Sequence, residues 1–236
     1  VLEGNKAGFR MLPGTTLKNS FTGEIIYTPP QDPEEIKDLM ANLEKLINDR
    51  ESSDFDPLVK MAIIHYQFES IHPFYDGNGR TGRIINILYL IQEKLQDLPI
   101  LYLSNYIIKN KPDYYRLLQE VRTNNNWEEW LLFMIDAVEQ TSRETIDLII
   151  KIRELMTNYK RTLRDNYKFY SQDLLNNLFK HPYTKIEFIQ HDLNVSRITA
   201  ANYLNQLADD KLLTKKKLGT ANYYINDPLF KLLSER

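Results

Sequence analysis

The chain has 236 residues, of which 42% are hydrophobic and 26% are charged, with a formal net charge of −2. This length suits one large or two moderate domains, and the composition is typical of a soluble globular protein. Cysteine is absent, which excludes disulfides, thiol catalysis and thiolate metal sites. No apolar run approaches the ~20 residues of a membrane span, and the first residues lack the pattern of a signal peptide. We therefore expect neither a membrane segment nor a leader.

The charge is distributed unevenly along the chain. Residues 157–236 carry 13 Lys and Arg against 8 Asp and Glu, a net charge of +5, which leaves −7 for residues 1–156. The acidic part is a poor candidate for binding nucleic acid, whereas the basic part is a possible one.

The first two thirds of the sequence predict a small hairpin followed by helices. A turn signal at residues 19–23 and a β-prone run that ends at Pro29-Pro30 predict a hairpin over about residues 19–30. Helical apolar spacing begins near Asp32. Four helices are predicted at about residues 32–47, 57–71, 111–122 and 127–154, and a fifth follows a loop at residues 72–79. The expected fold class is mainly α, with a first domain over residues 1–154.

The last third predicts a second domain. Residues 155–170 are polar and basic and favour a helical connector, and residues 171–236 show the three helices and two-stranded wing of a winged helix-turn-helix domain. Ser196 is the predicted N-cap of the third helix. The side chains of that helix and of the wing that could contact DNA are Arg197, Thr199, Asn202, Lys215, Lys216 and Lys217. Small winged helices also bind proteins, so both kinds of partner remain open.

The segment from His72 to Arg83 carries the strongest functional signal. Three of the eight glycines of the chain lie within six residues of one another, namely Gly77, Gly79 and Gly82. Glycine lets backbone N–H groups surround an anion, and the loop opens into a helix whose N-terminus favours negative charge. Arg80 and Arg83 share a face there, where positive charge opposes the helix dipole by ~0.3–1 kcal/mol each. A polyphosphate bound between the loop and both arginines resolves this conflict.

Two further side chains of the segment suggest a reaction. Asp76 is a carboxylate beside the predicted phosphate site, a position that suits Mg²⁺. His72 ends the preceding helix, and its near-neutral pKa suits it to accept a proton from an attacking hydroxyl. Phe74 lies between them and is expected to anchor the loop in the core.

Other interpretations explain fewer residues of the segment. A plain turn leaves the arginines and the histidine unexplained. An EF-hand loop that starts at Asp76 would need Gly at Thr81 and Glu at Ile87. A Walker P-loop would need Lys and Ser or Thr where Arg83-Ile84 stand. Taken alone, His72 would more often be a structural histidine, but its place in this segment favours a catalytic role.

The segment His72-Pro-Phe-Tyr-Asp-Gly-Asn-Gly-Arg-Thr-Gly-Arg83 resembles the signature of the Fic family, His-Pro-Phe-x-Asp/Glu-Gly-Asn-Gly-Arg-x-x-Arg, at every fixed position. The resemblance extends from about Leu2 to Glu139. It implies a Fic-type helical bundle with a β-hairpin flap. It also implies a protein adenylyltransferase that uses Mg²⁺ to move AMP from ATP to a Ser, Thr or Tyr hydroxyl of a target protein. Because the family occurs mainly in bacteria, a bacterial cytoplasm is expected.

The resemblance implies roles for individual residues. His72 would be the general base, and Asp76 would bind the Mg²⁺. The residues implied to hold the nucleotide are Asp76, Gly77, Asn78, Gly79, Arg80, Thr81, Gly82 and Arg83. The flap that aligns the target would comprise Ile25, Ile26 and Tyr27. Tyr114 and Tyr115 match an aromatic pair near the adenosine, which core packing explains equally well, and Arg122 replaces a family asparagine seven residues further on.

Many Fic proteins also carry an inhibitory helix, Ser/Thr-x-x-x-Glu-Gly/Asn, whose Glu blocks the γ-phosphate site. Glu3-Gly4-Asn5 matches only the end of that motif, and we expect it to be an ordinary helix end before Phe9-Arg10. The inhibitory element would then lie upstream or on another chain. A DNA-binding regulator whose Fic domain senses nucleotide or is inactive remains an alternative, as do a transferase with another cargo and a homodimer.

Overall fold

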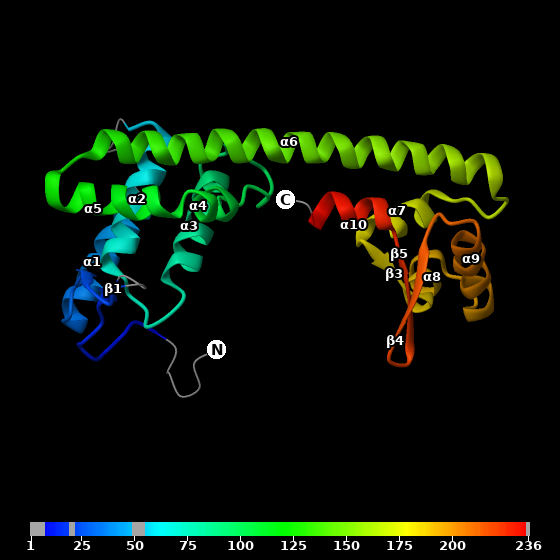
Figure 1. Cartoon of the computed structure of the whole chain (residues 1–236), viewed down its shortest axis with the longest axis horizontal. Coiled ribbons are helices and arrows are strands. Elements are labelled where there is room, and N and C mark those ends of the chain that lie inside the picture. The colour runs from blue at the N-terminus through cyan, green and yellow to red at the C-terminus, as the bar shows by residue number, and fades with distance from the viewer. Residues whose placement is uncertain (1–7, 19–21, 49–54, 235–236) are drawn as a thin grey trace. The chain divides into compact units, whose positions relative to one another are not determined.

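The computed structural model describes residues 8–18, 22–48 and 55–234, and the chain divides into two compact units, Val1–Arg143 and Glu144–Arg236 (Figure 1). The structure is mainly helical, as predicted. The elements of the first unit are β1 (Leu17–Lys18), β2 (Ile25–Tyr27), α1 (Pro33–Asn48), α2 (Pro57–Ile71), α3 (Asn78–Gln92), α4 (Ser104–Lys109), α5 (Lys111–Asn124) and the start of α6 (Trp127–Asn166).

Helix α2 is the centre of the first unit. Its apolar residues are spread around the whole helix, a pattern typical of a fully buried helix. Accordingly, Met61, Ile64 and Phe68 are at most 1% exposed, and α2 packs against both α1 and α3. Trp130 of α6 is fully buried and donates a hydrogen bond from Nε1 to the Ala62 carbonyl, at 3.1 Å. The C-terminal end of α2, where His72 follows, is therefore fixed by the core.

The contact between α2 and α3 depends on Gly82. A Cβ atom at Gly82 would lie 2.9 Å from Oε1 of Glu69 and 3.2 Å from atoms of His65 and Phe68. A methyl group there would therefore force the Glu69 carboxyl group to move and the side chains of His65 and Phe68 to shift by a few tenths of an ångström.

We expect Gly82→Ala to lower the free energy of unfolding by about 1–3 kcal/mol, because the added methyl group overpacks the helix contact. Urea denaturation followed by tryptophan fluorescence measures this, since both tryptophans, Trp127 and Trp130, lie in the first unit. Thr81→Ala, one residue earlier and partly exposed, is the control and should change stability by about 0.5 kcal/mol or less. Wild-type stability in Gly82→Ala would contradict the packing argument.

The predicted hairpin is present as the antiparallel strands β1 and β2, which pair Leu17 with Tyr27 and Lys18 with Ile25. Residues 19–21 of the predicted turn lie outside the described residues, as does Glu3-Gly4-Asn5. Gln31 closes the base of the hairpin, because its Nε2 donates to the Thr15 carbonyl at 3.0 Å and its Oε1 accepts from Gly14 N–H at 2.7 Å.

The second unit contains the rest of α6 and has its own apolar core, which includes Leu174, Ile189, Leu204 and Leu207. Its strands form a three-stranded antiparallel sheet in the order β3-β5-β4. The Ser196 hydroxyl caps α9 by accepting from Thr199 N–H at 3.1 Å, as predicted. The remaining elements are α7 (Gln172–Lys180), β3 (Tyr183–Thr184), α8 (Ile186–Leu193), α9 (Arg197–Asp209), β4 (Thr214–Leu218), β5 (Ala221–Ile225) and α10 (Asp227–Ser234).

Several elements differ from the prediction. Helix α3 begins at Asn78, so Asn78 and Gly79 belong to its first turn rather than to the loop. The helix expected to end near Glu154 continues to Asn166 as α6, because its polar residues continue the helix without a breaker. The short elements α4, β3 and α10 were not predicted. No helix in the described part of the chain is long and apolar enough to cross a membrane.

Candidate active site

His72 directly follows α2 and has the left-handed backbone angles φ 49° and ψ 57°. Its N–H donates to the Phe68 carbonyl at 3.0 Å, which terminates the helix. This conformation is common at helix ends for glycine or asparagine but uncommon for histidine, so neighbouring groups must hold it.

Arg10 holds the end of α2, although it was not among the predicted site residues. Its side chain is fully buried. The guanidinium donates from Nε to the His72 carbonyl at 2.9 Å, and from Nη2 to the carbonyls of Ile71, at 3.4 Å, and Pro30. Its backbone N–H donates to the Pro73 carbonyl at 2.8 Å. Arg10 therefore satisfies carbonyls that the helix end leaves free and places a cation at the negative end of the helix dipole.

The surroundings of His72 keep its imidazole uncharged. Burial lowers the pKa of His72 below its usual value, and the positive charges of Arg10 and Arg122 lower it further, whereas the Glu69 backbone carbonyl opposes the shift. Because an unperturbed histidine has a pKa near 6.5, His72 is neutral at pH 7 and can accept a proton.

The Asn78 side chain shapes the loop between His72 and α3. Phe74 N–H donates to Asn78 Oδ1 at 2.9 Å, and Asn78 Nδ2 donates back to the Phe74 carbonyl at 2.7 Å. Asn78 is only 2% exposed, so its side chain closes the turn and its backbone N–H is the group left for a ligand. The Phe74 ring packs against Phe9 and Phe68, with centroids 5.7 and 6.3 Å apart, which anchors the loop in the core as expected.

The N-terminus of α3 has the features of an anion site. Gly77 occupies the N-cap position with φ 85°, and no side chain caps the first turn within the described part of the chain. The first N–H groups of a helix have no partner inside the helix, and they attract anions. Asp76 accepts from Gly77 N–H at 2.7 Å and lies 3.3 Å from the guanidinium of Arg80, whose side chain is exposed. These exposed charges can rearrange around a ligand.

Arg83 and Glu69 converge on the first turn of α3. Arg83 donates from Nε to the Ser104 hydroxyl at 2.8 Å, and its Nη1 lies 3.2 Å from the point where a Cβ atom of Gly79 would stand. Oε1 of Glu69 lies 3.7 Å from that same point. Gly79 thus leaves the space that both charged groups share. Neither Ser104 nor Glu69 was predicted as a site residue.

Glu69 is an unusual carboxylate because it is buried and one of its oxygens lacks a hydrogen-bond partner within the described residues. It is 8% exposed, and its Oε1 has no hydrogen-bond partner within the described part of the chain. Burial raises the pKa of Glu69 to about 7, although the positive charges of Arg83 and Arg122 lower it. The neutral, protonated form of Glu69 is therefore accessible near neutral pH.

The residues at this site fit Mg²⁺ only in company with a phosphate ligand. No group of three or more His, Asp and Glu side chains that could hold a metal ion occurs among the described residues. Asp76 contributes a single exposed carboxylate. Mg²⁺ is commonly held by one or two carboxylates together with phosphate oxygens and water, so Asp76 fits a metal that arrives with a nucleotide.

The strand β2 is attached to the end of α2 through Tyr27. The Tyr27 hydroxyl donates to the Ser70 carbonyl at 2.8 Å, and the guanidinium of Arg122 stacks over its ring at 3.8 Å. Arg122 also approaches the Ser70 hydroxyl, at 3.4 Å. By contrast, Ile25 and Ile26 are 53% and 43% exposed, so they are the residues of the expected flap that remain accessible.

The two expected adenosine contacts, Tyr114 and Tyr115, have different environments. Tyr114 is 4% exposed, lies in the core and has its hydroxyl 2.9 Å from Nε2 of His65. Because the Tyr114 ring faces the core side of α5, a ligand cannot reach it. Tyr115 is 52% exposed and packs edge-on against Tyr114, so it is the accessible member of the pair.

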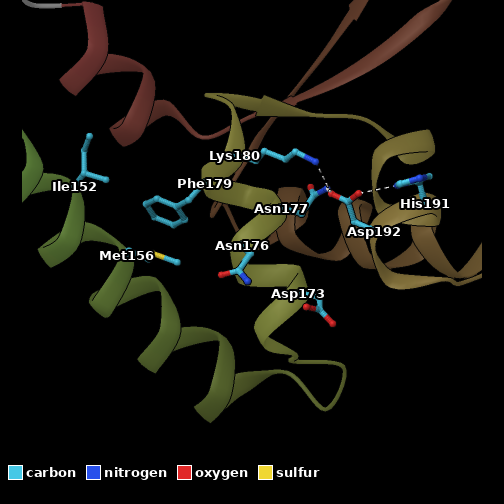
Figure 2. A pocket seen from close by; sticks show the side chains of 9 residues that line it. All are labelled: Ile152, Met156, Asp173, Asn176, Asn177, Phe179, Lys180, His191 and Asp192. Atoms are coloured by element: carbon cyan, nitrogen blue, oxygen red, sulfur yellow. Dashed lines mark hydrogen bonds and ion pairs between the residues drawn. The ribbon is translucent and has the colours of Figure 1, made fainter. Parts of the chain in front are cut away.

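The second unit contains a pocket in which most of the polar side chains contact one another (Figure 2). Its apolar side is formed by Ile152, Met156 and Phe179. On its polar side Asp192 accepts from Asn177 Nδ2 at 2.8 Å and pairs with His191 at 2.9 Å and Lys180 at 3.6 Å. These contacts are typical of structural ion pairs rather than of a reactive centre.

Three of the six residues predicted as possible DNA contacts form contacts within the chain. Arg197 pairs with Glu187 at 3.2 Å, Thr199 bonds to the Ser196 hydroxyl at 2.9 Å, and Lys215 donates to Asn205 at 2.8 Å. The side chains of Asn202, Lys216 and Lys217 are exposed.

The sequence model of the Fic/DOC family matches residues 5–90, and that of the C-terminal domain of SoFic-like protein adenylyltransferases matches residues 155–229. The chain is 36% identical to protein adenylyltransferase fic-1 of Caenorhabditis briggsae over 63 residues, which are 27% of this chain and 12% of that protein. It is 30% identical to protein adenylyltransferase Fic of Aedes aegypti over 112 residues, which are 48% of this chain and 21% of that protein. The match therefore spans about a fifth or less of the length of these relatives.

A Fic family protein from Desulfovibrio desulfuricans G20 has a similar fold, with a TM-score of 0.51 at 24% identity, covering 92% of this chain and 62% of that one. The two sequence models match parts of both units, and the first includes the complete motif from His72 to Arg83. The chain therefore contains a region of the Fic/DOC type at residues 5–90 and a C-terminal region of the SoFic-like type at residues 155–229.

Proposed function

We propose that this chain transfers AMP from ATP to a Ser, Thr or Tyr hydroxyl of a target protein and releases pyrophosphate. The observation that carries the proposal is the pairing of two features six residues apart. A neutral His72 is fixed at the end of α2 by Arg10, and an uncapped helix N-terminus follows it with Arg80 and Arg83. The named activity of the relatives from Caenorhabditis briggsae and Aedes aegypti supports the same reaction.

In the proposed reaction the hydroxyl oxygen of the target attacks the α-phosphorus of ATP, and His72 takes the hydroxyl proton. The bond from the α-phosphorus to the oxygen that bridges to the β-phosphorus breaks, and pyrophosphate leaves with that electron pair. The N–H groups at the start of α3 stabilise charge on the transferred phosphoryl group, and Arg80 and Arg83 stabilise the leaving group. Asp76 would hold a Mg²⁺ ion, which supplies further compensation of the phosphate charge.

The hairpin and α5 supply the two remaining parts of the proposed site. The exposed residues Ile25 and Ile26 of β2 would align a target segment by strand addition, while Tyr27 keeps that strand attached beside His72. Tyr115 would contact the adenosine. Positioning of both substrates supplies much of the rate of such transfers, because there is little covalent work for the enzyme to do.

The proposal is tested by incubating the protein and a lysate of potential targets with Mg²⁺ and ATP, GTP, UTP or CTP, each labelled at the α-phosphate. We expect protein-bound label from ATP that survives denaturation. Label from GTP, UTP or CTP instead of ATP would support nucleotide transfer, but with a nucleotide other than AMP as the transferred group. The absence of label from all four nucleotides would contradict a transferase and favour a nucleotide-sensing or inactive domain.

Duplex DNA is a second candidate ligand, through the C-terminal unit taken as a winged helix. It is favoured by the three consecutive exposed lysines of β4, Lys215–Lys217, and by the absence of acidic residues from Arg197 to Ala208 of α9. If these lysines contact phosphates, the affinity for DNA falls as salt rises, and replacing all three by glutamine lowers the steepness of that dependence. Fluorescence anisotropy with a labelled duplex measures both. Binding that is insensitive to salt, or no binding, would exclude this candidate.

A further inference from the structure

We propose that Glu69 must be protonated for a polyphosphate to bind at the N-terminus of α3, so that nucleotide binding takes up a proton at this carboxyl group. The inference rests on the proposed function in that the ligand is a nucleoside triphosphate. It adds a residue that the sequence motif does not contain.

The geometry places Glu69 beside the anion site rather than in ordinary core. Its Oε1 lies 2.9 Å from a Cβ position on Gly82 and 3.7 Å from one on Gly79, so the carboxyl group faces the first turn of α3. Arg83, an expected phosphate ligand, lies against the same Gly79 position. A phosphate that reaches Arg83 therefore enters the neighbourhood of Glu69.

The carboxyl group is poorly compensated where it stands. It is nine-tenths buried, Oε1 has no hydrogen-bond partner in the described part of the chain, and no ion pair within 4.0 Å joins it to an arginine there. A buried carboxylate with one unpartnered oxygen is costly, and a neighbouring anion increases that cost because like charges repel. A neutral carboxyl group avoids both penalties and can donate a hydrogen bond.

Two arginines, two tyrosines and one histidine surround the Glu69 carboxyl group. Arg83 of α3 and Arg122 of α5 are cations that favour the charged carboxylate, and burial outweighs them, which raises the pKa of Glu69 to about 7. Tyr114 and Tyr115 of α5 stay neutral because burial and Glu69 raise the pKa of each. On α2 itself, burial lowers the pKa of His65 to about 4, so His65 is also neutral. Among these groups Glu69 therefore has the pKa closest to neutrality.

The coupling between proton uptake and nucleotide binding determines how the affinity for nucleotide depends on pH. A bound polyphosphate adds negative charge and occupies Arg83, and both changes raise the pKa of Glu69. A group whose pKa rises on binding takes up a proton, so affinity is greatest below pH 7 and falls as the pH increases above it. If binding takes up one proton, the affinity for nucleotide falls by up to about tenfold for each pH unit above 7.

The experiment is isothermal titration calorimetry with Mg²⁺ and α,β-methylene ATP between pH 6 and 8.5, in buffers of different ionisation enthalpy that report the protons exchanged. We expect wild-type protein to take up more protons than Glu69→Gln above pH 7 and to lose affinity more steeply. Glu69→Gln should bind more tightly than wild type at pH 8. Titration of the γ-phosphate is common to both proteins and cancels in the comparison.

Two controls and a second Glu69 variant separate the possible outcomes. Glu129→Gln, an exposed carboxylate on α6, should keep the wild-type proton uptake, and so should His72→Ala if Glu69 is the acceptor. If Glu69→Gln does not fold, as judged by thermal melting, Glu69→Met provides a second non-titrating variant. Equal proton uptake in wild type and the Glu69 variants would overturn the inference. Failure of wild-type protein to bind at any pH would contradict the proposed function instead.

Discussion

Replacement of His72 by alanine is expected to reduce nucleotide transfer by about 10²–10⁴-fold, the usual contribution of a general base. The variant should keep its fold, because His72 is only partly buried and Arg10 bonds to its backbone carbonyl rather than to its ring. Single-turnover transfer from α-labelled ATP measures the rate, and binding of α,β-methylene ATP serves as the control. Wild-type transfer in His72→Ala would remove this residue from the chemistry.

The pH dependence of transfer provides a second measurement on His72. Because burial lowers the pKa of His72, the imidazole is in its base form at neutral pH, and the pH–rate profile of single-turnover transfer at saturating nucleotide should be flat above 7. The rate should fall on the acid side, where the imidazole becomes protonated. An acid limb centred above pH 7 would indicate that another group accepts the proton.

Replacement of Arg10 by alanine is expected to cost about 3 kcal/mol or more of unfolding free energy. It removes the donor for the buried carbonyls of Pro30, Ile71 and His72, each of which is costly to leave unsatisfied, and it leaves a cavity. Urea denaturation followed by tryptophan fluorescence measures this loss. Transfer should also fall in conditions where the variant is folded, because the left-handed conformation of His72 loses its support.

The matched control is Arg116→Ala on α5. Arg116 is an exposed arginine that pairs with Asp113 and Glu129 at 3.4 and 3.3 Å. Exposed ion pairs contribute about 0–1 kcal/mol, so this variant should remain close to wild type. If both substitutions have the same small effect, Arg10 does not organise the end of α2.

The sequence predicted the long helices well because their apolar residues recur over many turns. Helix α1, for example, carries its core residues Ile36 and Leu43 seven residues apart, which is two turns of one face. The elements α4 and β3 escaped prediction because six- and two-residue segments hold too few residues for a period to appear. Their formation depends on tertiary contacts.

The candidate site could be proposed from the sequence where its residues are close together along the chain. His72, Asp76, Arg80 and Arg83 lie within one short segment, so their types and spacing indicated phosphate chemistry. Arg10 and Ser104 act on this segment across 62 and 21 residues, and no local pattern shows such contacts. Glu69 left one signal, which is a carboxylate within an otherwise strongly apolar helix.

The structure also separates the motif residues by role. Asn78 closes the turn through Phe74, and Gly82 makes room for Glu69, so both shape the site from inside the fold. Gly77, with its left-handed φ and the free N–H groups behind it, faces the proposed ligand. The sequence motif alone does not distinguish residues that shape the site from residues that would face a ligand. The contacts in the structure make this distinction.

The central claim is that the α-phosphoryl group with its nucleoside is transferred and the β- and γ-phosphates leave. Parallel reactions with ATP labelled at the α-phosphate and ATP labelled at the γ-phosphate test this most directly. We predict that protein-bound label comes from the α-labelled ATP alone, while the γ-label appears in pyrophosphate. Protein-bound label from γ-labelled ATP would contradict the account, because it would show phosphate rather than nucleotide transfer.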